Sequence, residues 1–176
     1  VIQFTPILGR LARSASVFNE GSMPAPVNAF KAAIAHQRLQ IGLWMGLANP
    51  LTAEICGSAG YDWLVIDGEH APNDIPLMLS QLQALAGFAV HPVVRIVAGE
   101  DWMIKQVLDL GAQTLLVPMV ESPQAAAALV SATRYPPMGR RGVGAGLARA
   151  SVYNREPDYL KTANDQIALI VQVESR

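Results

Sequence analysis

The stretch DWLVIDGEH, residues 62–70, decides the fold. An apolar run rich in branched side chains ends abruptly in Asp67, Glu69 and His70. Such a short apolar run is typical of a buried strand in a parallel sheet. The polar residues come where the strand stops, so we expect its carboxyl end to face a ligand.

The pattern of strand, turn and helix repeats on both sides of this stretch. Strands are predicted near residues 41–45, 63–67, 93–96, 114–119 and 167–174. Helices with Asn, Asp or Ser at the N-cap, several followed by proline, are predicted between them. This alternation predicts a parallel α/β fold, either a closed barrel or an open doubly wound sheet.

Composition limits the class of protein. With 176 residues, 51% of them hydrophobic, the chain can bury one large core. A formal net charge of -1 without a basic stripe argues against partners such as nucleic acid or an anionic membrane surface. No apolar run approaches the roughly 20 residues of a membrane span. The single cysteine, Cys56, excludes an internal disulfide framework, so we expect a cytoplasmic protein in which Cys56 packs in the core.

Two segments depart from the repeating pattern. Residues 1–22 carry arginines among serines, and we expect them to be an extension of unclear origin that precedes a natural start at Met23. The domain would then span 23–176. Residues 135–146 are rich in glycine, proline and arginine, and a segment of this length inside a domain is usually functional, so we predict a lid or a carboxylate clamp.

Polar side chains gather at the carboxyl ends of the predicted strands. They are Trp44, Asp67, Glu69, His70, Arg95, Gln172 and Glu174. In a parallel barrel all these ends open on one face, where active sites of the class lie. Strands far apart in the sequence would therefore share one site.

Three of these residues suggest specific chemistry, each beside a simpler alternative. His70 is either a surface loop residue or a general base whose basicity Asp67 raises. Arg95 either forms a structural ion pair or binds a substrate carboxylate and stabilises an enolate. Glu174 either faces water or binds a hard divalent metal. We expect Glu69 to point away from the site, because it alternates with its neighbours, and we assign no role to His36 or His91.

Residues 28–176 also resemble a known family. The matching stretches are QIGLW (40–44), DWLVIDGEHAPN (62–73), PVVR (92–95), QTLLVPMV (113–120), RYPP (134–137), RGVG (141–144), RAS (149–151) and NDQ (164–166). These motifs are similar to those of the HpcH/HpaI aldolases. The resemblance does not extend to residues 1–22.

The resemblance implies a (β/α)8 TIM barrel of the phosphoenolpyruvate/pyruvate superfamily, here apparently truncated after about five strands. It implies a class II pyruvate aldolase, a lyase that uses Mg2+, Mn2+ or Co2+. The reaction would be reversible aldol cleavage of 4-hydroxy-2-oxoheptanedioate, an intermediate of aromatic catabolism, to pyruvate and succinic semialdehyde. A sibling activity on 2-dehydro-3-deoxy sugar acids and a truncated, non-catalytic chain remain alternatives.

The resemblance also implies roles for individual residues. His70 matches the catalytic base, Arg95 the enolate-stabilising arginine and Asp109 the aspartate that raises the basicity of the histidine. Gln172, and Trp44 at the first strand tip, would contact substrate, whereas Asp67 would orient the histidine or a water. Glu174 matches one metal ligand, and the family's second carboxylate ligand would lie beyond the chain end. The family suggests a homo-oligomer, commonly a hexamer.

Overall fold

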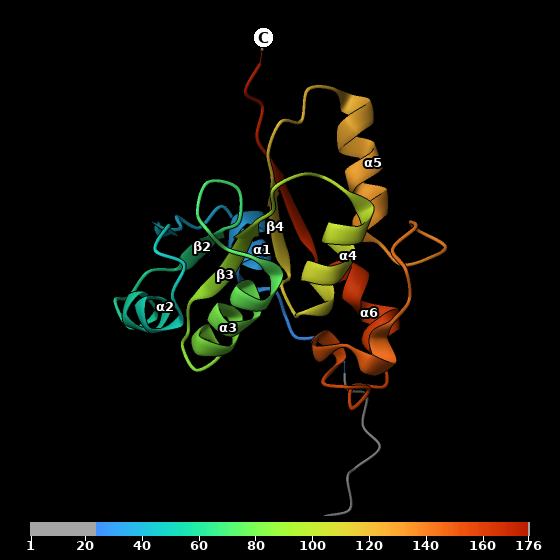
Figure 1. The fold of residues 1–176 in the computed structure, drawn as a ribbon. Coiled ribbons are helices and arrows are strands. Elements are labelled where there is room, and N and C mark those ends of the chain that lie inside the picture. Colours follow the sequence, from blue (N-terminus) through green and yellow to red (C-terminus); the bar gives the residue numbers. More distant parts are fainter. Residues whose placement is uncertain (1–23, 176) are drawn as a thin grey trace, which may run out of the picture.

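Five parallel strands form one curved sheet in the order β1-β2-β3-β4-β5 (Figure 1). The computed structural model describes residues 24–175, so the predicted extension over residues 1–22 lies outside the described part. The elements are α1 (Ala29–Ala35), β1 (Gly42–Met45), α2 (Pro50–Gly57), β2 (Trp63–Asp67), α3 (Ile75–Leu85), β3 (His91–Arg95), α4 (Asp101–Asp109), β4 (Thr114–Val117), α5 (Pro123–Thr133), η1 (Ala145–Leu147), η2 (Arg149–Ser151), α6 (Tyr159–Gln166) and β5 (Ala168–Val171). The predicted alternation of strands and helices is confirmed.

Helices α2, α3 and α5 begin where the sequence provides capping residues. Asn49, Asp74 and Ser122 each accept a backbone N–H of the first turn through a side-chain oxygen, and each helix has proline in that turn. A side-chain cap satisfies a backbone donor that the helix itself leaves free, and proline needs no such donor there. These caps fix where the chain turns from strand to helix.

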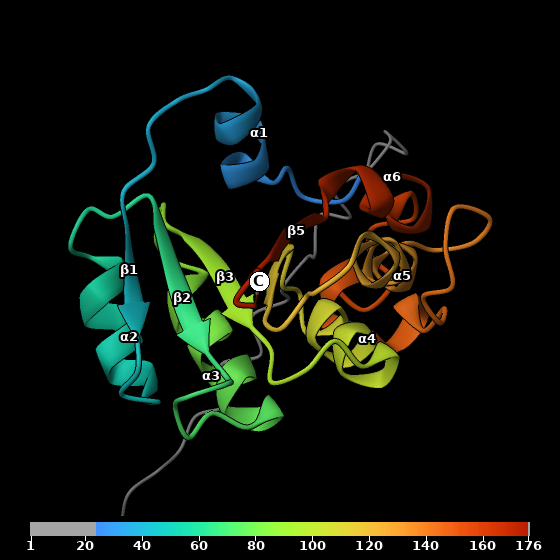
Figure 2. The ribbon, with the colours of Figure 1, turned by 90° about the horizontal axis from the view of Figure 1, so that it is seen from above.

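Side-chain alternation along the strands gives the sheet two different faces. Helices α2 to α5 follow the outer side of the curve (Figure 2). Leu64 and Ile66 of β2 join the large core beneath them, whereas Val65 belongs to a separate cluster with Val93 and Leu116. This second cluster lies on the inner face, because successive strand residues point to opposite sides.

The fourth and fifth strands end earlier than predicted. β4 stops at Val117 because Pro118 has no N–H for the ladder and Met119 turns the chain with a φ of 56°. β5 stops at Val171, although the Gln172 backbone still pairs with Val117 and Val120. Residues 172–174 therefore lie just beyond the last strand, next to the end of β4.

The end of the sheet where the strands begin is held by Asn28, the N-cap of α1. Its Oδ1 accepts the Lys31 N–H at 2.8 Å, while its Nδ2 donates to the Gln113 carbonyl, the Thr114 hydroxyl and the Gln166 carbonyl. Asn28 is 1% exposed. One amide thus joins α1, β4 and the end of α6.

Two arginines of the segment 135–146 bind the carboxylates at the two ends of α4. Arg140 makes two hydrogen bonds to the Asp101 carboxylate at the start of α4, and buried Arg141 donates to Asp109 at its end. Both arginines thus pair with carboxylates of this chain, and a role of the segment as a lid or as a carboxylate clamp for a ligand stays a prediction. Within residues 24–175, no helix has the length and apolar character to cross a membrane.

Candidate active site

The centre of the site is a buried ion pair between neighbouring strands. Asp67 and Arg95 are register partners at the carboxyl ends of β2 and β3. Arg95 Nε donates to Asp67 Oδ1 at 2.8 Å and Nη2 donates to Oδ2 at 2.6 Å. The two side chains are 9% and 6% exposed. A bidentate pair of this kind fixes the plane of the guanidinium.

Asp67 is held by more donors than Arg95 alone provides. Its carboxylate also accepts the backbone N–H groups of Glu69 and His70 and the indole N–H of Trp44, at 3.0, 3.2 and 3.2 Å. Burial acts to raise the pKa of Asp67, but the hydrogen bonds from Arg95 and from these backbone groups outweigh it and bring the pKa to about 2. Hydrogen bonding to Asp67 in turn raises the pKa of Arg95. Both groups are therefore charged near neutral pH.

The loop after β2 needs Gly68 at its first position. The Gly68 N–H donates to the Arg95 carbonyl at 2.8 Å, and a Cβ at residue 68 would lie 2.7 Å from that oxygen. Further along, Asn73 donates to the Asp67 carbonyl and receives a hydrogen bond from buried Gln81. These contacts hold the loop that carries Glu69 and His70 against β3.

Glu69 belongs to the site, and the prediction that it points away was wrong. Its Oε2 lies 2.6 Å from Arg95 Nη1, and its side chain is only 14% exposed. The expectation of alternation failed because β2 ends at Asp67, so Glu69 lies in a loop rather than a strand. The break at Gly68 was the signal in the sequence that could have identified it.

His70 lies at the rim with its side chain 76% exposed. Its backbone N–H, rather than its ring, bonds Asp67. The carboxylate facing the imidazole is that of Glu69, with 3.7 Å between His70 Nε2 and Glu69 Oε1. His70 is thus accessible to a molecule bound at the strand ends.

Trp44, Gln172 and Glu174 complete the group that the sequence predicted. The Trp44 ring centre lies 5.0 Å from Arg95 Cζ. Gln172 Oε1 lies 3.5 Å from Arg95 Nη1, and its Nε2 donates to Glu174 Oε1 at 3.2 Å. Glu174 Oε2 accepts the Met119 N–H. The ends of β1, β2, β3 and β5 therefore converge on Arg95, as expected.

The charges of this group favour a cation. Three carboxylates, Asp67, Glu69 and Glu174, accompany one guanidinium, which leaves a formal charge of −2. Glu174 supplies the hard oxygen donors that Mg2+ and Mn2+ prefer. Among residues 24–175, however, no group of three or more His, Cys, Asp or Glu side chains is arranged to hold a metal ion. The described residues therefore show no complete metal site.

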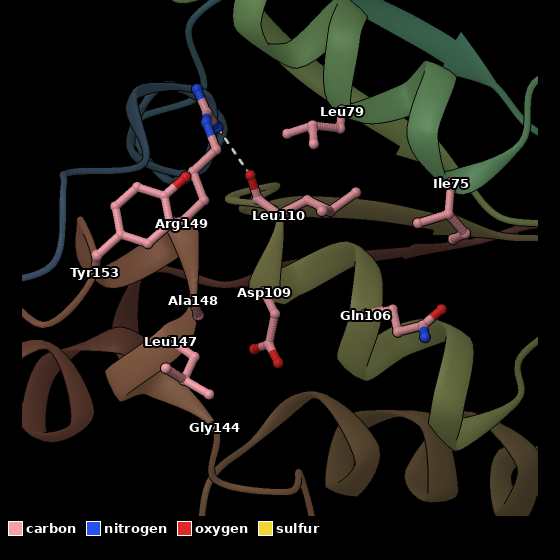
Figure 3. Close-up of a pocket in the computed structure, with 10 residues that line it drawn as sticks. All are labelled: Ile75, Leu79, Gln106, Asp109, Leu110, Gly144, Leu147, Ala148, Arg149 and Tyr153. Atoms are coloured by element: carbon pink, nitrogen blue, oxygen red, sulfur yellow. Dashed lines mark hydrogen bonds between the residues drawn. The ribbon is translucent and has the colours of Figure 1, made fainter.

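Asp109 is not brought to His70 within the described chain. It ends α4, which leads from the carboxyl end of β3 to the start of β4. Its carboxylate lines a pocket of about 390 Å3 between α3, α4, η1 and η2 and points toward Leu147 and Gly144 (Figure 3). Arg141 donates to Asp109 Oδ1 at 2.6 Å. Within the described residues the ion-pair partner of Asp109 is Arg141, and its role toward His70 stays a prediction.

The residues without an expected role have structural surroundings. His91 stacks on Phe30, and burial lowers its pKa to about 4. Exposed His36 caps α1 and contacts the Ala32 carbonyl through Nδ1. Cys56 is partly buried against the main core, as predicted from its place in a helix.

A parallel α/β sheet with ionisable residues converging at its carboxyl ends is the architecture of a barrel enzyme. The sequence matches the family HpcH/HpaI aldolase/citrate lyase over residues 40–176. The chain belongs to this family, and its fold is that of the TIM-barrel aldolases.

Individual relatives agree with this assignment. A hydroxypyruvate/pyruvate aldolase of Deinococcus radiodurans is 62% identical over 160 residues, which cover 88% of this chain and 58% of the relative. A 4-hydroxy-2-oxo-heptane-1,7-dioate aldolase of Salmonella arizonae is 58% identical over 149 residues, covering 85% and 57%. A crystal structure of a family member from Burkholderia cenocepacia superimposes with a TM-score of 0.82 at 46% identity, covering 85% of this chain and 60% of that one. The chain thus spans about three fifths of the length of these relatives.

Proposed function

We propose that this chain carries the 2-oxo-acid site of a pyruvate aldolase. The reaction would be reversible aldol cleavage of 4-hydroxy-2-oxoheptanedioate to pyruvate and succinic semialdehyde. The observation that carries the proposal is Arg95, a buried guanidinium at the strand ends whose Nε and Nη2 are fixed by Asp67 and whose Nη1 faces Gln172. Membership of an aldolase family supports it.

Arg95 would act on the charge that develops during cleavage. Breaking the C3–C4 bond of a 4-hydroxy-2-oxo acid leaves an enolate whose negative charge rests largely on the former keto oxygen. A donor fixed in advance stabilises such an oxyanion without reorganisation, and losing one such donor typically costs about 100- to 1000-fold in rate. The ion pair with Asp67 supplies this fixed orientation.

His70 would accept the C4 hydroxyl proton. Imidazole is the most common general base in enzymes, and the exposed position of His70 lets it reach a bound substrate. The loop contacts of Asp67 and Gly68 hold its backbone at the rim. Trp44 and Gln172 flank Arg95 and are placed to contact the oxo acid.

We also propose a divalent cation at Glu174, in keeping with the excess of carboxylates around Arg95. A cation bound there would supply Lewis-acid polarisation of the keto oxygen. Glu174 is the suitable ligand because, among the described residues, its carboxylate accepts hydrogen bonds from the neutral donors Gln172 and Met119, whereas Asp67 and Glu69 are engaged by Arg95.

A second candidate substrate set comes from the relatives. Several proteins that are 55–62% identical are named hydroxypyruvate/pyruvate aldolase, which indicates hydroxypyruvate as an alternative to pyruvate. Cleavage of 2-dehydro-3-deoxy sugar acids is a third possibility with the same oxo-acid end. All three share the chemistry at Arg95 and differ in the remainder of the substrate.

The direct test is an assay of pyruvate release from 4-hydroxy-2-oxoheptanedioate with Mg2+ or Mn2+ and after EDTA treatment. We expect release that depends on the cation, because polarisation of the keto oxygen would be lost with it. Identification of the products from a 2-dehydro-3-deoxy sugar acid, and condensation assays with hydroxypyruvate, separate the substrate sets. A folded sample that releases no oxo acid from any of them would contradict the proposal.

A further inference from the structure

Two carboxylates contact Arg95, but they are bound very differently. Asp67 accepts five N–H groups, from Arg95 Nε and Nη2, Trp44, Glu69 and His70. It cannot move without breaking all of these bonds. Asp67 is therefore a permanent partner of the guanidinium.

Glu69 lacks such anchoring. Its Oε2 is buried and lies 2.6 Å from Arg95 Nη1, yet it has no partner in good hydrogen-bond geometry among the described residues. Its Oε1 lies 3.7 Å from His70 Nε2, too far for a hydrogen bond. A buried carboxylate held by charge attraction alone is much easier to displace than Asp67.

Glu69 also contacts the side of the guanidinium that faces Gln172 and the other strand ends. Nη1 is the nitrogen that approaches Gln172, and Gln172 leads on to Glu174. Nε and Nη2 are turned toward Asp67 instead. Glu69 Oε2 therefore lies on the same nitrogen that an oxygen atom of a ligand would approach from the strand ends, and the two would compete for it.

We propose that Glu69 is a positioning residue that occupies the anion position on Arg95 until an oxo acid displaces it. While the site is empty, the carboxylate occupies the side of the guanidinium that Asp67 leaves open. When a ligand oxygen takes Nη1, the Glu69 side chain moves toward the solvent-exposed imidazole of His70, which its Oε1 already faces. This inference rests on the proposed function, because it takes the ligand to be a 2-oxo acid.

The test is pyruvate binding, measured calorimetrically with Mg2+ present, for the unmodified chain and for Glu69→Gln. The amide retains the size of Glu69 but not its charge, so the competing anion is lost. We expect pyruvate affinity to rise by about threefold or more, since even a modest loss of competition of about 0.7 kcal/mol gives that ratio. Glu54→Gln, on the exposed side of α2, is the matched control and should leave the affinity unchanged.

A merely structural role for Glu69 predicts the opposite result. Unchanged or weaker pyruvate binding by folded Glu69→Gln would overturn the inference while leaving the proposed function in place. No binding by the unmodified chain would contradict the proposed function and the inference together. If Glu69→Gln does not fold, a crystal structure of the unmodified chain with pyruvate decides: the Glu69–Arg95 contact should open while all Asp67 contacts persist, and an intact contact beside bound pyruvate would refute the inference.

Discussion

At the scale of single residues, the site depends on how tightly Asp67 is held. Donors from β3, from β1 and from its own loop converge on one carboxylate. This arrangement orients Arg95 and also keeps Asp67 ionised to strongly acidic pH, with a pKa of about 2. Because the pKa is depressed in the folded protein, Asp67 stabilises the fold above the pKa of an unfolded aspartate and loses this effect as the pH falls toward 2.

The stabilisation should therefore be visible as acid sensitivity. We expect the difference in unfolding free energy between the parent and Asp67→Asn to shrink by about 2 kcal/mol between pH 4 and pH 2. Urea unfolding across this range measures it. Asp101→Asn is the control, because Asp101 pairs with Arg140 at the surface and water screens that pair. If the stability differences of Asp67→Asn and of Asp101→Asn from the parent change equally with pH, the buried hydrogen bonds of Asp67 do not add to the acid sensitivity of the fold.

At the scale of elements, the helices and strands followed from local signals, whereas the contacts between distant elements did not. Apolar runs and capping residues predicted the strands and helices, because caps and alternation are local effects. The clamp of Arg141 on Asp109 joins residues 32 positions apart, so no local pattern predicted its partner. Family resemblance suggested a role for Asp109 but not the surroundings that this chain provides.

Among the contacts between distant elements, those of Asn28 are the easiest to measure by their contribution to the free energy of unfolding. Replacing Asn28 by alanine should lower the free energy of unfolding by about 2–3 kcal/mol, because a helix cap is lost and buried acceptors lose their donor. Asn49→Ala removes the same type of cap at an exposed position and should cost about 1 kcal/mol. Denaturant unfolding of both variants gives the comparison, and equal losses would show that the buried bonds of Asn28 contribute nothing beyond its cap.

At the scale of the whole molecule, the curvature of the parallel sheet assembles the site. Trp44, Asp67 and Arg95 lie in β1, β2 and β3, and Gln172 directly follows β5. The sequence separates the first and last of these residues by more than half of the described chain. Their convergence was predictable, because the carboxyl ends of parallel strands share one edge. The orientation of Glu69 was not, since it depends on the loop geometry after Gly68.

The most direct test of Arg95 as the oxo-acid site is to compare pyruvate binding by the unmodified chain and by Arg95→Lys. Lysine keeps the charge but cannot maintain the two-pronged contact with Asp67 while presenting a third nitrogen to a ligand, so we predict at least about tenfold weaker binding. Arg140→Lys alters an equally bidentate but exposed pair with Asp101 and should bind like the parent. Calorimetric titration of the three proteins, with folding checked by circular dichroism, gives the answer. If Arg95→Lys binds pyruvate as tightly as the parent and Arg140→Lys do, the strand-end guanidinium is not the oxo-acid site.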